Sequence, residues 1–349
     1  MSEEPDKALE VFLNYPDIDE YTAETFQLLG NLFRDRGEVD RALRVHQNVI
    51  ARSNLNAKQK QKAMYALGQD FFAAGMLDRS ESVFQELLES NVKWISKSDI
   101  CSSLRTIYEQ TQEWQKAVEA TDCVKQNSKK SDDSNNLINN DSLISHYYCE
   151  LADQALREGN LHEVDGYIAK AKKAYKLSTR LMTLQGDVAL HQKQYKQALK
   201  HYLKAVQEDS RLLNMLSTKI EETANQTGDM PFVQDSLLKL FKKNKVKAIF
   251  EVILSLSTKY KLTTDVDALI AEILPTEKLN IESIYRATEY INIRKGEFEP
   301  EKGMILVNES LGNYLKGSPA FRCEHCGYKM HDYLWRCPAC HHWDTVEHA

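Results

Sequence analysis

Apolar side chains recur three and four residues apart along most of the chain, which is the spacing of one buried face of an α-helix. The pattern can be aligned on Gly30, which is followed twelve residues later by Ala42 and then by the apolar Val49. The same arrangement returns at Gly68 and at Gly186. Small residues at fixed places in an apolar pattern indicate helices that cross closely. The pattern therefore predicts a series of packed helix pairs.

Weaker copies of this pattern centre on Arg105 and Ala152. The step from Ala152 to Gly186 is 34 residues, and so is the step from Ala8 to Ala42. This is the period of the tetratricopeptide repeat, in which each repeat is a pair of antiparallel helices. We therefore predict an all-α fold in which tetratricopeptide repeats stack into a solenoid over residues 1–211.

Two departures from the regular period divide the chain further. Residues 126–141 are almost wholly polar, so we expect an inserted loop between two repeats. After about residue 212 the repeat consensus decays while helical spacing continues, which predicts divergent or capping repeats over residues 212–318. The helices expected there cover residues 212–226, 231–243, 246–260, 265–273, 281–294 and 301–314, with breaks at Pro275 and Pro300.

The first residues match the second helix of a repeat, because Ala8 and Phe12 take the places of Ala42 and His46. The first helix of that repeat is not in the sequence, and a lone second helix would expose the face that its partner covers. We therefore expect that the chain begins within a domain, and a membrane anchor is one candidate for what preceded it.

The composition of the 349 residues fits a soluble, folded helical protein. Hydrophobic residues make up 42% and charged residues 28%, the mean hydropathy is −0.52, and glycine (13) and proline (7) are scarce. No apolar run is long enough to span a bilayer, and residues 1–5 do not begin a signal peptide. The net charge of −6 argues against a protein that binds nucleic acid by broad phosphate neutralisation, but it leaves room for a local basic patch.

Four of the seven cysteines form two Cys-x-x-Cys hooks, Cys323 with Cys326 and Cys337 with Cys340. Two such hooks can place four thiolates at the corners of a tetrahedron, an arrangement that zinc and iron both accept. With cysteine at all four positions the site is closed and structural. Residues 319–349 are too few to hold a core alone, so metal binding should supply most of their folding energy, on the order of 10 kcal/mol. The aromatic residues expected to surround the hooks are Phe321, Tyr328, Tyr333, Trp335 and Trp343.

Other roles for the cysteines fit the pattern less well. Two disulfides, free thiols or a redox pair are the alternatives to a metal, but the two hooks occur together at ligand spacing. With no export signal the default compartment is reducing, so we expect no disulfide framework involving Cys101, Cys123 or Cys149. We expect the nearby histidines to face solvent or to support the ligands, with replacement of a cysteine ligand as the alternative; they are His325, His331, His341 and His342.

The first helices of stacked repeats line a concave groove, whose polar residues are candidates for binding a peptide or protein. The alternative for each of them is a solvated position on a helix. We also expect the metal-binding domain to pack against the repeats. The candidate groove residues are Asn31, Arg34, Asp35, Gln69, Phe72, Glu109, Asp153, Arg157, Asp187 and His191.

Four parts of the sequence resemble a known family. They are residues 30–47, the segments 113–117 and 146–152, and the terminal pattern of Cys-x-x-Cys-Gly, Leu-Trp, Cys-Pro-x-Cys and Trp. Together they resemble the lipopolysaccharide assembly protein B family. The resemblance covers nearly the whole chain and is looser over residues 126–141 and 212–315.

This resemblance implies tetratricopeptide repeats followed by a small rubredoxin-like or zinc-ribbon domain over residues 319–349, which would hold one zinc or iron ion. It implies a regulatory adaptor that promotes degradation of the lipid A deacetylase through a membrane-bound AAA protease of the FtsH type. The implied partners are this protease, the deacetylase and other lipopolysaccharide assembly proteins, with a second copy of the chain as a further candidate. Family members carry an N-terminal transmembrane helix that places them on the cytoplasmic face of the bacterial inner membrane, and this sequence lacks that helix.

Motifs typical of enzymes fail on inspection. Residues 312–317 have the glycine spacing of a P-loop but no lysine after the second glycine, and His162-Glu163 lacks the second histidine of a zinc protease. We therefore expect no catalytic site. The alternative function is a rubredoxin-like electron carrier in which the four hook cysteines hold redox-active iron. Nucleic-acid binding by the hooks gains little support from a nearly balanced local charge.

Overall fold

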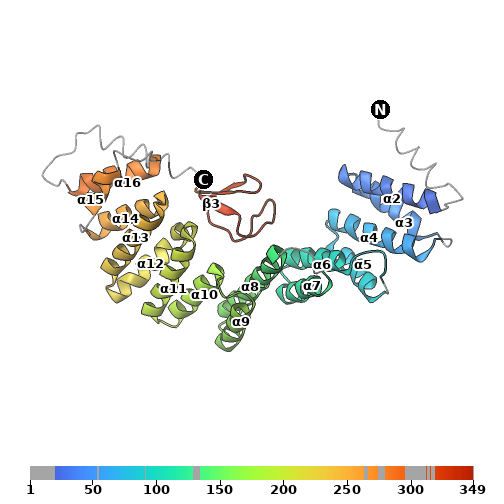
Figure 1. Cartoon of the computed structure of the whole chain (residues 1–349), viewed down its shortest axis with the longest axis horizontal. Coiled ribbons are helices and arrows are strands. Elements are labelled where there is room, and N and C mark those ends of the chain that lie inside the picture. The colour runs from blue at the N-terminus through green and yellow to red at the C-terminus, as the bar shows by residue number, and fades with distance from the viewer. Residues whose placement is uncertain are drawn as a thin grey trace. The chain divides into compact units, whose positions relative to one another are not determined.

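The computed structural model describes residues 20–52, 55–90, 92–128, 134–262, 266–273, 280–294 and 319–348, together with Gly312 and Leu315. The chain divides into two compact units, Met1–Lys176 and Leu177–Ala349, and each is described by itself (Figure 1). The expected helices at residues 6–12 and 301–314 and the breaks at Pro275 and Pro300 lie outside the described residues.

The first unit consists of consecutive antiparallel helix pairs, as the repeat pattern predicts. Its helices are α2 (Glu20–Asp35), α3 (Val39–Ile50), α4 (Ala57–Ala73), α5 (Leu77–Glu89), α6 (Lys97–Thr111), α7 (Trp114–Asn127), α8 (Ser134–Arg157) and α9 (Leu161–Ala174). Each odd-numbered helix packs against the helix before it, so the pairs are α2–α3, α4–α5, α6–α7 and α8–α9.

The second unit continues with helices and ends in a small sheet. Its helical elements are α10 (Thr179–His191), α11 (Tyr195–Glu208), the short 3-10 helix η1 (Ser210–Leu212), α12 (Leu213–Thr227), α13 (Met230–Asn244), α14 (Lys247–Tyr260), α15 (Val266–Ile273) and α16 (Ile281–Arg294). The strands β1 (Phe321–Cys323), β2 (Lys329–Met330) and β3 (Val346–His348) pair antiparallel in the order β2-β1-β3. The fold is therefore helical repeats followed by a small three-stranded domain.

A glycine of the first helix faces a ring of the second helix in three of the pairs. At Gly186 an added Cβ would lie 2.4 Å from the ring of Tyr202, which leaves no room for any side chain. The pairs are Gly30 with His46, Gly68 with Phe84, and Gly186 with Tyr202, each sixteen residues apart. This contact is the physical reason for the repeated glycine in the sequence pattern.

The position twelve residues after the alignment centre is fully buried in all five repeats. The residues there are Ala42, Ser80, Ala117, Val164 and Ala198. The position seven residues after the centre has a left-handed backbone, with φ between 59° and 78°, and holds Gly37, Gly75, Gln112, Gly159 and Lys193. The weak repeats centred on Arg105 and Ala152 therefore keep the geometry of the strong ones.

The expected loop over residues 126–141 is wrong for most of its length. Helix α7 runs to Asn127 and α8 begins at Ser134, so the segment between the two helices is much shorter than the polar run. Tertiary contacts stabilise the start of α8, because Asp141 accepts a 2.5 Å hydrogen bond from Lys125 of α7 and Asn140 accepts one of 3.3 Å from Arg105 of α6. These contacts override the low helix propensity of the polar residues.

A disulfide bond that we did not expect joins the helices of the third pair. Cys101 of α6 and Cys123 of α7 are bonded, with their Cα atoms 6.0 Å apart. The antiparallel hairpin brings these two positions face to face, whereas spacing in the sequence does not reveal it. Cys149 of α8 is buried and does not belong to this disulfide.

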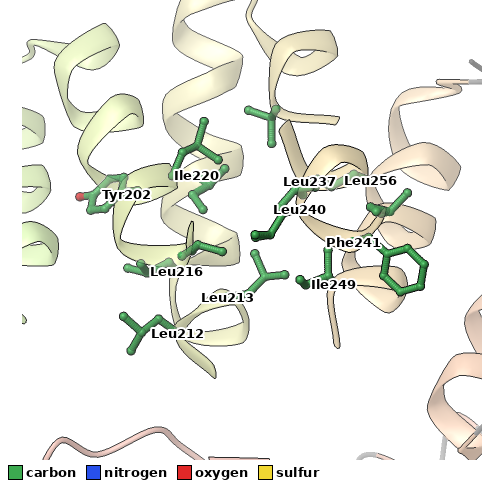
Figure 2. Close-up of a cluster of buried hydrophobic side chains, with 14 of the residues drawn as sticks. Tyr202, Leu212, Leu213, Leu216, Ile220, Leu237, Leu240, Phe241, Ile249 and Leu256 are labelled. Atoms are coloured by element: carbon green, nitrogen blue, oxygen red, sulfur yellow. The ribbon is translucent and has the colours of Figure 1, made fainter. Parts of the chain in front are cut away.

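A continuous apolar core runs through the second unit, although the repeat consensus has decayed there (Figure 2). It joins side chains such as Tyr202 of α11, Leu213 of α12, Phe241 of α13 and Ile249 of α14. The helices of this part match the expected ranges within two residues, which confirms that helical spacing is enough to place them.

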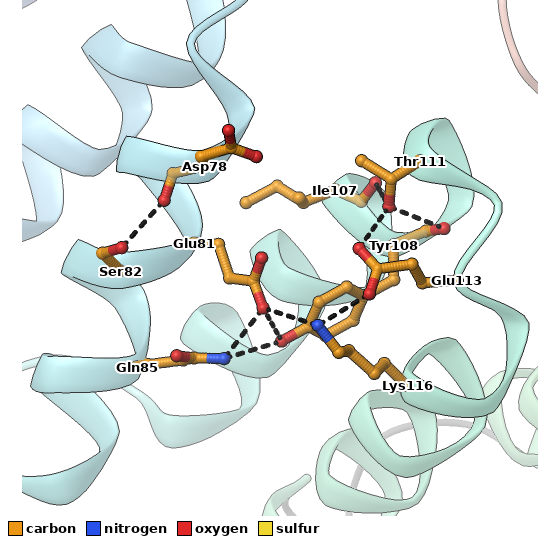
Figure 3. Close-up of polar contacts among 9 residues, drawn as sticks. All are labelled: Asp78, Glu81, Ser82, Gln85, Ile107, Tyr108, Thr111, Glu113 and Lys116. Atoms are coloured by element: carbon orange, nitrogen blue, oxygen red, sulfur yellow. Dashed lines mark hydrogen bonds and ion pairs between the residues drawn. The ribbon is translucent and has the colours of Figure 1, made fainter.

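Polar contacts also connect successive helix pairs in the first unit (Figure 3). The carboxylate of Glu81 in α5 accepts hydrogen bonds of 3.1 Å from the Tyr108 hydroxyl of α6 and of 3.1 Å from the Lys116 ammonium of α7. Burial raises the pKa of Tyr108, so its hydroxyl stays a donor at neutral pH. These contacts lie at the edge of the packed helices and are partly exposed.

Candidate metal centre

The two cysteine hooks have the same backbone design. In the first hook, the Gly327 amide donates to the Cys323 carbonyl at 2.8 Å, and in the second the His341 amide donates to the Cys337 carbonyl at 2.9 Å. Gly327 (φ 74°) and His341 (φ 60°) directly follow the second cysteine of each hook and have left-handed backbones. The glycine suits this conformation, whereas His341 adopts it at a cost of about 1 kcal/mol.

The four sulfur atoms form one cluster. All four lie within 4.8 Å of one another, and none belongs to a disulfide. The Sγ atoms of Cys323 and Cys340 are 3.6 Å apart, and those of Cys326 and Cys337 are 3.7 Å apart. A tetrahedral ion with metal–sulfur bonds of about 2.3 Å needs sulfur–sulfur distances of about 3.8 Å. The cluster therefore fits one metal ion with four thiolate ligands.

Hydrogen bonds to sulfur favour the ionised form that a metal requires. Burial opposes ionisation of the Cys323 thiol, but the Thr345 hydroxyl, 3.2 Å from its sulfur, and backbone amides lower its pKa to about 6. The His342 amide lowers the pKa of Cys340, yet burial and the three neighbouring sulfurs raise it to about 12 overall. Four thiolates repel one another at this distance, and a bound cation would compensate their charge.

The nearby histidines are exposed, as expected, and do not replace a cysteine in the cluster. The rings of His325 and His342 stack at 3.7 Å, and with Cys340 they bring three potential ligand atoms together. Cys340 already belongs to the four-sulfur cluster, and His342 donates from Nδ1 to the Cys340 carbonyl at 3.0 Å. His342 thus contacts the backbone of the second hook, and His325 of the first hook stacks on its ring.

The aromatic surroundings of the hooks are confirmed in part. Phe321 and Tyr333 are buried and meet edge to face at 5.7 Å, and Tyr333 meets Trp335 in the same way at 5.3 Å. Tyr328 is 46% exposed, so its expected place around the hooks is wrong. It lies between Gly327 and the first residue of β2.

The metal-binding domain packs against the helices of its own unit, as expected. Phe321, Tyr333 and Val346 belong to the same apolar core as Leu212 and Leu213. Arg180 of α10 lies over the ring of Trp335 at 5.8 Å. The small domain therefore shares the core of the helical repeats.

Polar contacts fix the position of the domain on α12. Arg211 donates to both carboxylate oxygens of Asp209 and, at 3.3 Å, to the carbonyl of Asp344. Hydrogen bonding to Asp209 raises the pKa of Arg211, which keeps the guanidinium charged. Asn214 and His348 approach within 3.4 Å. No sequence pattern pointed to Arg211 or Asn214, because their partners are more than 130 residues away.

Several candidate groove residues already have internal partners. The Arg34 guanidinium donates to Asp70 at 2.9 Å, Glu109 is buried and accepts from the Tyr147 hydroxyl, and Asp187 accepts from Tyr202 at 2.7 Å. Asn31 accepts from Arg34 at 2.9 Å, and Arg157 lies 3.8 Å from the Asp153 carboxylate. All candidates except Glu109 are partly or fully exposed: Asn31, Arg34, Asp35, Gln69, Phe72, Asp153, Arg157, Asp187 and His191. Asp187 and His191 belong to the second unit and the others to the first.

A hollow in the first unit gathers two of these candidates with apolar residues that the sequence analysis missed. Asn31 of α2 and Gln69 of α4 line it together with Leu28, Tyr65 and Ile95. Leu28 is 65% exposed, and Leu32, one turn further along α2, is 56% exposed. The two leucines are four residues apart, so they lie on the same side of α2, away from α3. This spacing was the sequence feature that could have revealed the exposed apolar surface. The hollow combines apolar side chains and amide groups with the charged Glu24 and Lys62, which suits a peptide segment.

Comparisons with known proteins agree with this division of the chain. Residues 321–348 match the rubredoxin metal binding domain, and residues 25–58 match the tetratricopeptide repeat. Lipopolysaccharide assembly protein B of Escherichia coli (strain K12) is 27% identical over 351 residues, which cover 99% of this chain and 86% of that protein. The protein of the same name from Haemophilus influenzae is 26% identical over 357 residues, with the same two coverages.

Two solved structures align with part of the chain. A crystal structure of YrrB, described as a tetratricopeptide-repeat protein with an unusual peptide-binding site, covers 63% of this chain at 16% identity with a TM-score of 0.38. A crystal structure of MamA covers 55% at 14% identity with a TM-score of 0.36.

Among the described residues, no helix combines the length and apolar character needed to cross a bilayer.

Proposed function

Because this chain belongs to the lipopolysaccharide assembly protein B family, we propose that it is a non-catalytic adaptor in lipopolysaccharide assembly. The observation that carries the proposal is similarity along 99% of the chain, which includes both the repeats and the metal-binding domain. The repeats supply packed helix surfaces for protein binding, and the metal-binding domain packs against α10, η1 and α12 of the second unit.

In more detail, we propose that the chain brings the lipid A pathway deacetylase to an FtsH-type AAA protease at the cytoplasmic face of the bacterial inner membrane. The hollow beside Leu28 and Gln69 is our candidate for the contact with one of these partners, because it offers exposed apolar surface beside amide donors and acceptors. A rigid, preformed surface of this kind loses little conformational entropy on binding.

A paired set of variants tests this proposal. Leu28→Asp with Leu32→Asp changes the hollow, whereas Met76→Asp with Leu161→Asp places the same charges on exposed apolar residues outside it. The first variant should lose copurifying deacetylase or protease, and the deacetylase should persist longer in cells that carry only this variant. Equal recovery of both partners with the two variants would remove the hollow from the mechanism.

The metal ion in this proposal is zinc with a structural role, since the four ligands leave no open position. The alternative is an electron carrier with iron, which the exposed position of Cys326 at the edge of the site favours. Metal analysis and an absorption spectrum of protein purified from its own bacterium separate the two. A red protein with a reversible one-electron couple would support the electron carrier.

A further inference from the structure

The outer face of α11 carries a row of lysines that have no acidic partner. Lys196, Lys200 and Lys204 are exposed and follow one another at intervals of four residues, so they share one side of the helix. Within the described part of the chain, none of the three forms an ion pair with a carboxylate. The row extends about 12 Å along the helix axis.

This arrangement opposes the stability of the helix. Like charges four residues apart repel each other, and Lys196 lies in the first turn, where the positive end of the helix dipole disfavours a cation. Helix α11 has no acidic residue in its first turn to offset this. Burial and the charges of Lys200 and Lys204 lower the pKa of the neighbouring His201, which reflects the positive potential of this face. A row of charges that costs folding free energy points to a role in binding an anion.

The row is part of a larger basic surface. Lys193, in the turn before α11, has a left-handed backbone at a position where three other repeats have glycine. It lines an open depression with Lys196 and the amide side chains of Gln194, Gln197 and Gln226. The depression offers only donors and neutral groups and no carboxylate, which suits a phosphate group.

Helix α13, which packs beside α11, also carries exposed lysines. Lys239 and Lys243 are exposed on the same side of α13 as Phe232, whose side chain is 57% exposed, because these positions are seven and eleven residues apart. Lys242 and Lys245 are exposed nearby. Lys239 pairs with Asp235 at 2.6 Å, while Lys242, Lys243 and Lys245 have no acidic partner among the described residues. The chain as a whole has a net charge of −6, so this surface departs strongly from the average.

We propose that the face formed by Lys193, Lys196, Lys200 and Lys204 of the α10–α11 hairpin, with the lysines of α13, binds the surface of a bilayer that carries anionic phosphate headgroups. The cations are lysines without arginine, and lysine acts as a flexible point charge rather than a fixed bidentate donor. An extended row of such charges fits many mobile headgroups better than a single phosphopeptide or a base edge. Phe232 adds an exposed ring that can reach the boundary between headgroups and acyl chains.

Vesicle binding by the purified full chain tests this proposal. The probe is phosphatidylcholine vesicles containing phosphatidylglycerol, with pure phosphatidylcholine vesicles as the reference. The chain should bind the anionic vesicles at about 0.1 M ionic strength and much less at about 0.5 M, because the attraction is screened. Lys196→Gln, Lys200→Gln and Lys204→Gln together should weaken the vesicle partition coefficient on the order of 100-fold.

The matched control is Lys60→Gln, Lys93→Gln and Lys97→Gln, which removes three exposed lysines of the first unit and changes the net charge equally. This control should bind nearly as well as the unchanged chain. The α11 variant should keep or raise the melting temperature, since it removes repulsion within the helix. A purely structural role of the row predicts the opposite change in stability.

Three results would overturn the proposal. They are equal losses in the two triple variants, loss of vesicle binding when inorganic phosphate replaces chloride at constant ionic strength, and binding of polyglutamate or duplex DNA without binding of anionic vesicles. The second would assign the face to free phosphate and the third to an acidic macromolecule. The inference goes beyond the proposed function, and because the assay contains no protein partner, its failure leaves the adaptor role unaffected.

Discussion

Gly186 meets the ring of Tyr202 only sixteen residues later, within one helix pair, whereas Asn214 of α12 meets His348 of the metal-binding domain 134 residues later. The helix pairs are built from such local contacts, repeated from one pair to the next. The metal-binding domain has three short strands and relies on a four-sulfur cluster and on apolar side chains that join the core of its neighbours. Local packing lets a region fold from its own sequence, while the small domain depends on an ion and on a surface supplied by other helices.

Removal of the metal should have the largest effect and should be confined to the small domain. Cys337→Ser, or treatment with a strong chelator, should remove on the order of 10 kcal/mol of binding free energy that stabilises the domain. We expect amide exchange over residues 319–348 to become fast while the helical circular dichroism remains nearly unchanged. Cys149→Ser, which alters a buried cysteine of α8 outside the four-sulfur cluster, is the control that should keep the metal. Loss of most of the helical signal in Cys337→Ser would show that the repeats depend on the domain.

Substitution of the glycine that faces a ring should lower the stability of a helix pair more than other small changes in its helices. Gly186→Ala places a Cβ 2.4 Å from the Tyr202 ring and should destabilise the second unit by about 1–3 kcal/mol. Gly166→Ala is the matched control, because its Cβ in α9 meets nothing within 4 Å and alanine favours the helix by about 1 kcal/mol. Chemical denaturation measures both changes. A stabilised Gly186→Ala variant would mean that the two helices can separate without cost.

Loss of a polar contact that docks the small domain should have a smaller effect than either of these changes. Arg211→Ala removes the hydrogen bond to the Asp344 carbonyl and leaves Asp209 without its partner, at a cost of about 1–2 kcal/mol. Limited proteolysis should then cut between the helices and residue 319 faster, with the metal still bound. Arg157→Ala, at an exposed ion pair of 3.8 Å, should leave the cleavage rate unchanged. Unchanged protection in Arg211→Ala would mean that the apolar core alone holds the domain.

The smallest effect should come from a buried carboxyl group between α14 and α16. Burial raises the pKa of Glu251, whose carboxylate accepts a 2.7 Å hydrogen bond from Ser283. Since this pKa is higher in the folded than in the unfolded chain, ionisation destabilises the fold as the pH rises above the carboxyl's usual 4.5. Glu251→Gln keeps the acceptor and should raise the melting temperature slightly at pH 7, with the gain vanishing near pH 4. The same gain at both pH values would assign it to packing instead of charge.

The metal ligands of the candidate site were predictable, because the two cysteines of each hook are close in sequence. Cys323 and Cys326 share one turn, as do Cys337 and Cys340, so spacing alone identifies the hooks. Thr345, which contacts the Cys323 sulfur, was not predicted, because only the pairing of β1 with β3 brings it there. The contacts of individual groove candidates were not predictable either, since the partner of Glu109 is Tyr147 of the following helix pair.

By itself, the sequence determined which residues form helices, which small residues lie where two helices cross, and which cysteines form the four-sulfur cluster. These features depend on spacings of at most seventeen residues, over which the geometry of a helix, a helix pair or a tight turn is nearly fixed. Only the tertiary structure decided where α8 begins, that Cys101 and Cys123 are bonded, and which helices support the metal-binding domain. Those outcomes depend on contacts between segments far apart in the chain, where many partners compete and the free energy of packing selects among them.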